Sequence, residues 1–112
     1  MPVLVAVRDL LFRSKIQEAA ARAGVEVRFA PRDRPLADVV RELGGGTVLA
    51  DLNQPDALEA LRVGASSGVR AIGWLGHLQK DLMDEASAAG VEVLTRGQLV
   101  AKLDGILRGA VP

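Results

Sequence analysis

The sequence contains no cysteine and no tyrosine, and it has one tryptophan and two phenylalanines among 112 residues. Without cysteine, the chain has no disulfide bond, thiolate metal ligand or thiol catalysis. The one histidine, His77, excludes metal centres and catalytic pairs that need two histidines. Aromatic residues make up 3%, and basic and acidic residues are balanced at 14 each. We therefore expect no nucleic-acid partner, because stacking surfaces and a positive field are both missing.

From the sequence we expect neither a membrane-spanning helix nor a signal peptide. No apolar run approaches the roughly 20 residues that a transmembrane helix requires. The first apolar residues have no basic region ahead of them, and Asp9 follows closely, which is typical of a strand and not of a signal peptide. We therefore expect a cytoplasmic protein without a membrane partner. Arginine outnumbers lysine, which favours a GC-rich bacterial source.

Short apolar runs alternate with helical stripes along the chain, which indicates repeated βα units in one domain, residues 1–112. We expect strands at 3–7, 25–29, 47–51, 71–75 and 91–94. The second and fifth carry alternate charges, as edge strands do, whereas the others are apolar throughout. Right-handed crossovers then give the order 2-1-3-4-5 in a three-layer, doubly wound, flavodoxin-like α/β fold. The glycines at 44–46 lack a phosphate-loop pattern and indicate a helix stop.

In such sheets the functional crevice lies beyond the carboxyl ends of the strands. Eight residues follow or end strands at this edge and form the candidate pocket: Arg8, Asp9, Asp51, Asn53, Gly76, His77, Thr95 and Arg96. We expect His77 to be a loop or helix-start residue, and Trp74 to be mainly a core residue near the crevice. The charged run at 32–34 is expected to be a solvated loop.

The segment at 49–56 resembles the stretch around the phosphoacceptor aspartate of response-regulator receiver domains. In that family an aspartate ends the third strand and a proline follows four residues later, as Asp51 and Pro55 do here. The residues Ala88-Ala89-Gly90 resemble the family's turn before the fifth strand. Strand spacing agrees along nearly the whole chain, so the resemblance implies a receiver fold and a regulatory role.

The phosphorylation pocket departs from the family pattern at three places. The two acidic residues that hold magnesium in the family correspond to Val7 and Arg8. The family's switch threonine or serine falls on Leu75, and its lysine corresponds to Arg96, with no proline after it. Phosphoryl transfer depends on metal charge, so we expect a non-catalytic pseudo-receiver without metal or cofactor.

Four arrangements of this pocket are open. Arg8 takes the place of the metal and pairs with Asp51, and Thr95 and Arg96 extend the network. Alternatively, Asp51 only satisfies loop amides. In a third arrangement, Arg8 and Arg96 together bind an external anion, as in a small-molecule or nucleotide-binding domain. In the last, Asp9 serves as a metal ligand and Asp51 is a working phosphoacceptor.

The last helix has a broad apolar face that includes Leu99, Val100 and Leu103. Receiver domains often associate through their fourth and fifth helices. The resemblance therefore implies a protein partner or a homodimer contact through these helices, at those three residues.

Overall fold

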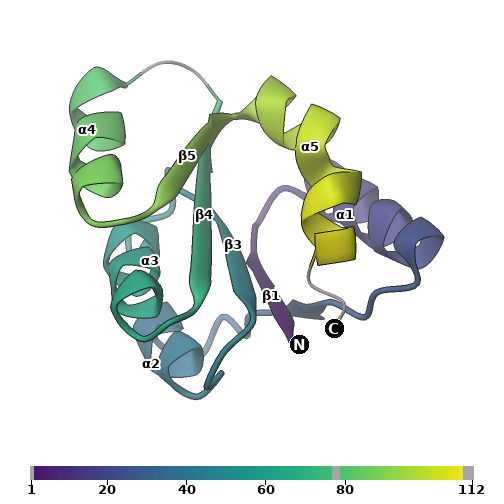
Figure 1. The fold of residues 1–112 in the computed structure, drawn as a ribbon, viewed down its shortest axis with the longest axis horizontal. Helices are drawn as coiled ribbons and strands as arrows, with labels where there is room; N and C mark the ends of the chain where they lie inside the picture. Colours follow the sequence, from purple (N-terminus) through teal and green to yellow (C-terminus); the bar gives the residue numbers. More distant parts are fainter. Residues whose placement is uncertain (1, 77–78, 110–112) are drawn as a thin grey trace.

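The computed structural model describes residues 2–76 and 79–109. The strands are β1 (Val3–Ala6), β2 (Arg28–Phe29), β3 (Thr47–Asp51), β4 (Arg70–Leu75) and β5 (Glu92–Thr95). They form one five-stranded sheet in the order β2-β1-β3-β4-β5, and every pairing is parallel (Figure 1). The order predicted from the charged edge strands is confirmed.

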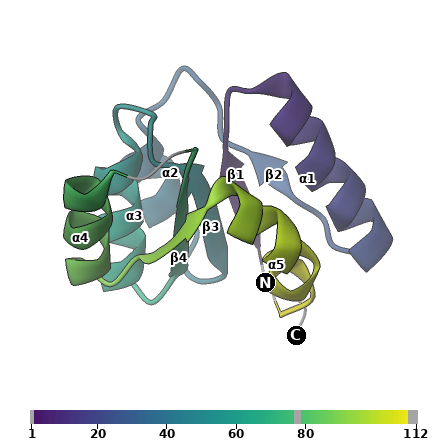
Figure 2. The ribbon, with the colours of Figure 1, turned by 90° about the horizontal axis from the view of Figure 1, so that it is seen from above.

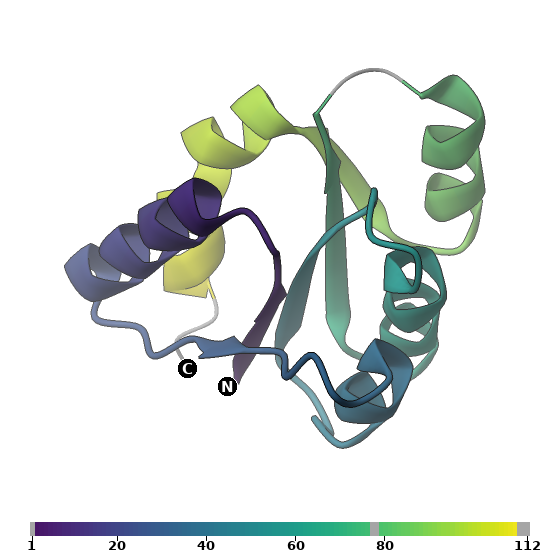
Figure 3. The ribbon, with the colours of Figure 1, turned by 180° about the vertical axis from the view of Figure 1, so that it is seen from behind.

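Helices cover both faces of the sheet. They are α1 (Leu10–Ala23), α2 (Leu36–Arg41), α3 (Ala57–Ser66), α4 (Lys80–Ala88) and α5 (Arg96–Gly109). Figures 2 and 3 show α1 and α5 on one face of the sheet and α2, α3 and α4 on the other. The three-layer flavodoxin-like fold is confirmed. Among the helices of the described residues, none is long and apolar enough to cross a membrane.

The sheet separates two hydrophobic cores. Successive side chains of a strand point to opposite faces, so Val5 lies in the core beneath α1 and α5, and Leu4 lies in the core beneath α2 and α3. Leu49 and Val48 on β3 divide in the same way. Burial on both faces explains why the central strands are apolar along their interiors and carry polar residues only at their ends, at Thr47, Asp51 and Arg70.

Trp74 ties the sheet to the start of α1. Its side chain is fully buried, and its ring stacks on Phe12 at a centroid distance of 5.2 Å and an interplanar angle of 19°. The expectation of a core residue is confirmed. The indole Nε1 is buried without a hydrogen-bond partner in the described part of the chain. Trp74 thus contributes packing and no polar contact.

The second strand is shorter than predicted. Only Arg28 and Phe29 pair with β1, while Val25 and Val27 pack against the first core as irregular chain. Gly24 explains the difference: it adopts a left-handed conformation at φ 69° and turns the chain away from α1. As a result, β2 pairs with the sheet over two residues only.

The glycine run connects α2 to β3, in agreement with its predicted role after a helix. Gly44 and Gly46 have φ of 67° and 89°, which side chains rarely adopt. A Cβ atom on Gly46 would lie 2.2 Å from the carbonyl oxygen of Pro2. That oxygen accepts the N–H of Thr47 at 3.0 Å, so it is fixed at the start of the sheet.

Candidate functional site

Asp51 ends β3 at the carboxyl edge of the sheet, as predicted. Its Oδ1 accepts the backbone N–H of Asn53 at 2.9 Å, which closes a local turn. No ion pair within the described ranges joins Asp51 to Arg8. The predicted pairing of Arg8 with Asp51 is therefore wrong; Arg8 instead lines a hollow together with Arg32, Gln54 and Asp56. Asp51 and Asn53 shape the loop, as the second arrangement proposed.

Asp9 is the N-terminal cap of α1. Its Oδ1 accepts the backbone N–H groups of Leu11 at 2.9 Å and of Phe12 at 3.3 Å. These are donors that the first turn of a helix leaves unsatisfied. A role as a metal ligand would compete with this capping.

The donor set does not fit magnesium. Mg²⁺ requires octahedral oxygen ligands, yet the aligned acidic positions hold Val7, which is buried, and Arg8, which is a cation. The structure, over 2–76 and 79–109, contains no group of three or more histidine, aspartate or glutamate side chains that could hold a metal ion. With Asp9 and Asp51 bonded to backbone amides, too few free oxygens remain.

Thr95 caps α5 instead of extending a pocket network. Its Oγ1 accepts the N–H of Gln98 at 3.1 Å, and the Gln98 Oε1 accepts the N–H of Thr95 at 2.9 Å. This reciprocal pair is a capping box, for which the sequence carries the T-x-x-Q pattern at 95–98. Our sequence analysis overlooked that signal.

Arg96 lies apart from Arg8. Its guanidinium carbon is 5.4 Å from the centre of the Phe12 ring, and a Cβ on Gly76 would lie 3.6 Å from its Nη2. Arg96 lines a hollow of about 420 Å³ between the starts of α1 and α5, whereas Arg8 lines a different hollow. The predicted anion site shared by Arg8 and Arg96 is therefore wrong. His77, the remaining candidate, lies outside the described residues.

Three apolar side chains are exposed where these two helices begin. Leu10, Leu11 and Val100 are 70%, 80% and 46% exposed, and we call them the helix-start surface. Leu99 and Leu103, which we expected at an interface, are 0% and 5% exposed because they pack in the first core. Of the three predicted contact residues on α5, only Val100 can touch a partner.

A second hollow, which we call the arginine hollow, lies where β1 and β2 end. Its volume is about 80 Å³, and its polar lining is Arg8, Arg13, Arg32, Arg34, Gln54 and Asp56. The sequence analysis missed this cluster, since it treated the run at 32–34 as a solvated loop. The available signal was the placement of arginines directly after the first two strands.

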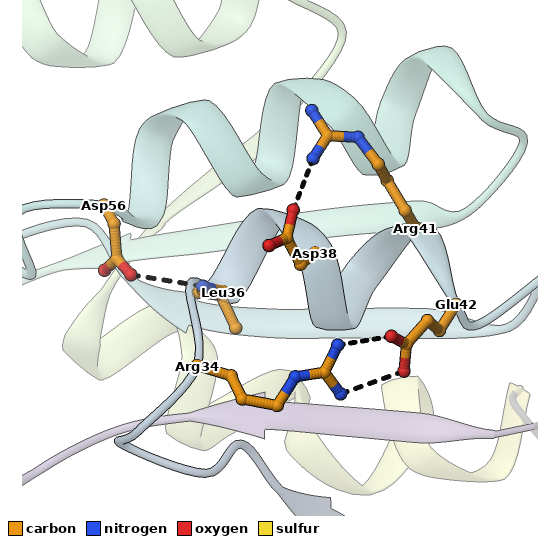
Figure 4. A network of polar contacts seen from close by, with 6 residues as sticks. All are labelled: Arg34, Leu36, Asp38, Arg41, Glu42 and Asp56. Carbon is orange, nitrogen blue, oxygen red and sulfur yellow. Dashed lines mark hydrogen bonds and ion pairs between the residues drawn. The ribbon is translucent and has the colours of Figure 1, made fainter.

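Two polar contacts brace one wall of this hollow (Figure 4). Arg34 donates two hydrogen bonds to the Glu42 carboxylate, one of them at 3.0 Å from Nη1 to Oε1. These hydrogen bonds raise the pKa of Arg34 and lower the pKa of Glu42. Asp56 lies at the start of α3 but makes no side-chain capping bond there; it accepts the backbone N–H of Leu36 at 3.3 Å and satisfies the start of α2.

Solved structures of known proteins share this architecture. A response regulator from Hahella chejuensis has a TM-score of 0.75 at 11% identity, over 99% of this chain and 96% of its own. A response regulator from Thermotoga maritima has a TM-score of 0.70 at 16% identity, over 96% and 98%. The flavodoxin of Megasphaera elsdenii has a TM-score of 0.56 at 16% identity, over 98% and 100%. No protein-family model matches the chain, and no curated protein matches it. The chain has the flavodoxin-like fold of response-regulator receiver domains.

Proposed function

We propose that this chain is a bacterial, cytoplasmic receiver-like signalling domain that acts by binding a protein partner. In this proposal it has no catalytic activity, and Asp51 is not phosphorylated. The observation that carries the proposal is that both carboxylates at this edge of the sheet accept backbone N–H groups: Asp51 accepts that of Asn53, and Asp9 caps α1. Within the described residues, neither carboxylate belongs to a group of three acidic or histidine side chains that could hold the metal ion on which phosphoryl transfer depends.

The neighbouring residues add to this argument. Acyl phosphate formation needs a cation that offsets charge on the transferred group. Arg8, which follows β1, is a cation, but its side chain lines the arginine hollow and makes no ion pair with Asp51 within the described residues. Leu75, at the family's switch position, is buried and has no hydroxyl that could bond a phosphoryl oxygen. A fixed structure, without a phosphorylation switch, follows from these residues.

The helix-start surface is the contact site that we propose. Leu11 and Val100 line the 420 Å³ hollow between α1 and α5, together with the cations Lys15 and Arg96 and with Asp9, whose carboxylate accepts N–H groups of α1. Exposed leucine and valine side chains grouped beside cations suit a partner that inserts an apolar side chain flanked by a carboxylate. The partner is either another protein or a second copy of this chain.

Incubation with acetyl phosphate and magnesium should leave the mass of the protein unchanged. The reason is that no metal site offsets the charge that develops at Asp51. Intact-protein mass spectrometry measures this, with an active receiver domain treated in parallel as the positive control. A phosphoryl adduct that forms on the wild type and is lost in Asp51→Asn would overturn this half of the proposal.

Photo-crosslinking should map the contact to the helix-start surface. A photoreactive phenylalanine analogue placed at Leu11 or Val100 should form a crosslinked protein adduct in the source cells, because these side chains face the partner. The matched control is Gln17, which is exposed on α1 but does not line the hollow. Adduct masses separate a second copy from another protein. Equal crosslinking at positions 11 and 17, or none at 11 and 100, would refute the contact site.

A further inference from the structure

The arginine hollow is small and lies apart from the helix-start surface. Its volume of about 80 Å³ corresponds to two or three water molecules, given that each occupies about 30 Å³ in the liquid. This is the size of one phosphate group and far too small for a flavin or a nucleotide base. The two hollows share no lining residue, so a ligand here would occupy a different place from the proposed protein contact.

The lining is strongly cationic in a chain whose formal net charge is zero. Arg8, Arg13 and Arg32 take part in no ion pair or side-chain hydrogen bond with the other residues of the described ranges. Only one carboxylate, that of Asp56, joins them in the lining. Three guanidinium groups around one small space repel one another unless an anion lies between them.

Local contacts hold two of the four arginines of this lining in place before any ligand binds. The Arg13 guanidinium carbon lies 4.1 Å from the centre of the Phe29 ring, a cation–π contact that fixes its position. Arg34 is fixed by Glu42. Pro31 and Pro35 bracket the loop that carries Arg32 and restrict its backbone. Donors that are already held, as Arg13 and Arg34 are, lose little entropy on binding.

Gln54 adds an acceptor to these donors. Its side chain lines the hollow, and its Oε1 is buried without a hydrogen-bond partner in the described part of the chain. An unbonded buried oxygen costs free energy that a ligand hydroxyl would recover. Hydrogen phosphate carries both the oxyanions that guanidinium groups bind and one hydroxyl that can donate to Gln54. Sulfate has no such hydroxyl.

We propose that the arginine hollow is a binding site for a phosphate group, either free hydrogen phosphate or the phosphate of a hydroxylated small-molecule ester. Arg8 and Arg32 donate to its oxygens from the ends of β1 and β2, and Arg13 donates from α1. Gln54 accepts from a ligand hydroxyl. The site differs from the Asp51 edge in residues and in chemistry, since no covalent bond forms.

Isothermal titration calorimetry at constant ionic strength and neutral pH tests this proposal with sodium phosphate, glucose 6-phosphate and sodium sulfate. We expect saturable binding of one phosphate per chain, and sulfate weaker by at least about threefold. Tighter binding of free phosphate identifies the inorganic ion, and tighter binding of the sugar phosphate identifies an ester. The Gln54 side-chain amide signals should shift during a parallel NMR titration.

Arg8→Gln and Arg32→Gln should each weaken phosphate binding at least about tenfold, because each removes a charged bidentate donor. Both side chains are exposed, and circular dichroism melts verify that the variants fold. Arg62→Gln on α3 is the matched control and should bind as the wild type does. Absence of binding by the wild type at millimolar phosphate, or equal affinity in Arg8→Gln, Arg32→Gln and Arg62→Gln, overturns the site.

Discussion

Trp74→Ala is expected to lower the free energy of unfolding by about 3–5 kcal/mol, the cost typical of a large aromatic residue truncated in a core. The indole is fully buried beneath α1 and α5 and stacks on Phe12. Its removal leaves a cavity at the centre of the first core that neighbouring strands cannot fill. Urea denaturation followed by circular dichroism measures the effect, because the variant has no tryptophan fluorescence.

Trp74→Phe is the control for this prediction. It keeps a ring against Phe12 and removes the Nε1–H that is buried without a partner in the described residues. Part of the packing loss is then offset by removal of an unsatisfied donor. We expect less than half the destabilisation of the alanine variant. A loss below about 1 kcal/mol for Trp74→Ala would contradict the structure, since losses of that size are typical of substitutions outside a packed core.

Gly46→Ala is expected to destabilise the protein by about 2–5 kcal/mol, from two costs that add. A positive φ costs a residue with a Cβ about 1–2 kcal/mol, and Gly46 has φ 89°. The new Cβ would also lie 2.2 Å from the Pro2 carbonyl oxygen, which is bonded to Thr47 and cannot easily move. Relief of such overpacking costs about 1–3 kcal/mol more.

Two further glycines separate these costs. Gly44 has φ 67° with no atom within 4 Å of an added Cβ, so Gly44→Ala should show only the conformational cost of about 1–2 kcal/mol. Gly105 lies within α5 and has neither obstacle, so Gly105→Ala should stabilise by about 0.5–1 kcal/mol. Trp74 fluorescence during urea unfolding reports all three. Equal losses in Gly44→Ala and Gly46→Ala would show that the Pro2 contact is relieved without cost.

The strand order was predictable because burial leaves a direct mark on composition. The segments predicted as central strands, 3–7, 47–51 and 71–75, are apolar apart from Thr47 and Asp51, whereas the segments that hold β2 and β5 carry charged residues such as Arg28 and Glu92. The apolar face of α5 was recognised for the same reason. Its pattern did not show how much the sheet and α1 cover, so Leu99 and Leu103 were assigned to an interface and lie in the core.

The pocket was less predictable because several roles compete for the same polar side chain. An acidic residue after a strand can bind a metal, pair with arginine or cap the next helix, and Asp9 and Asp51 bond to local backbone amides. Arg8, Arg13 and Arg32 are brought together only by the pairing of β1 with β2 and the packing of α1. The spacing of these arginines along the sequence does not indicate that long-range arrangement.

The short β2 strand has a consequence for how this protein behaves at high concentration. An outer strand of two residues presents few free backbone donors and acceptors to an incoming chain. At the opposite edge of the sheet, the Arg70 Nε donates a hydrogen bond to the Glu92 Oε1 at 2.9 Å, which places charged side chains beside β5. Edge-to-edge pairing of strands between chains is disfavoured at both borders. Contacts through side chains on the helices and loops are therefore favoured over extension of the sheet from one chain to the next.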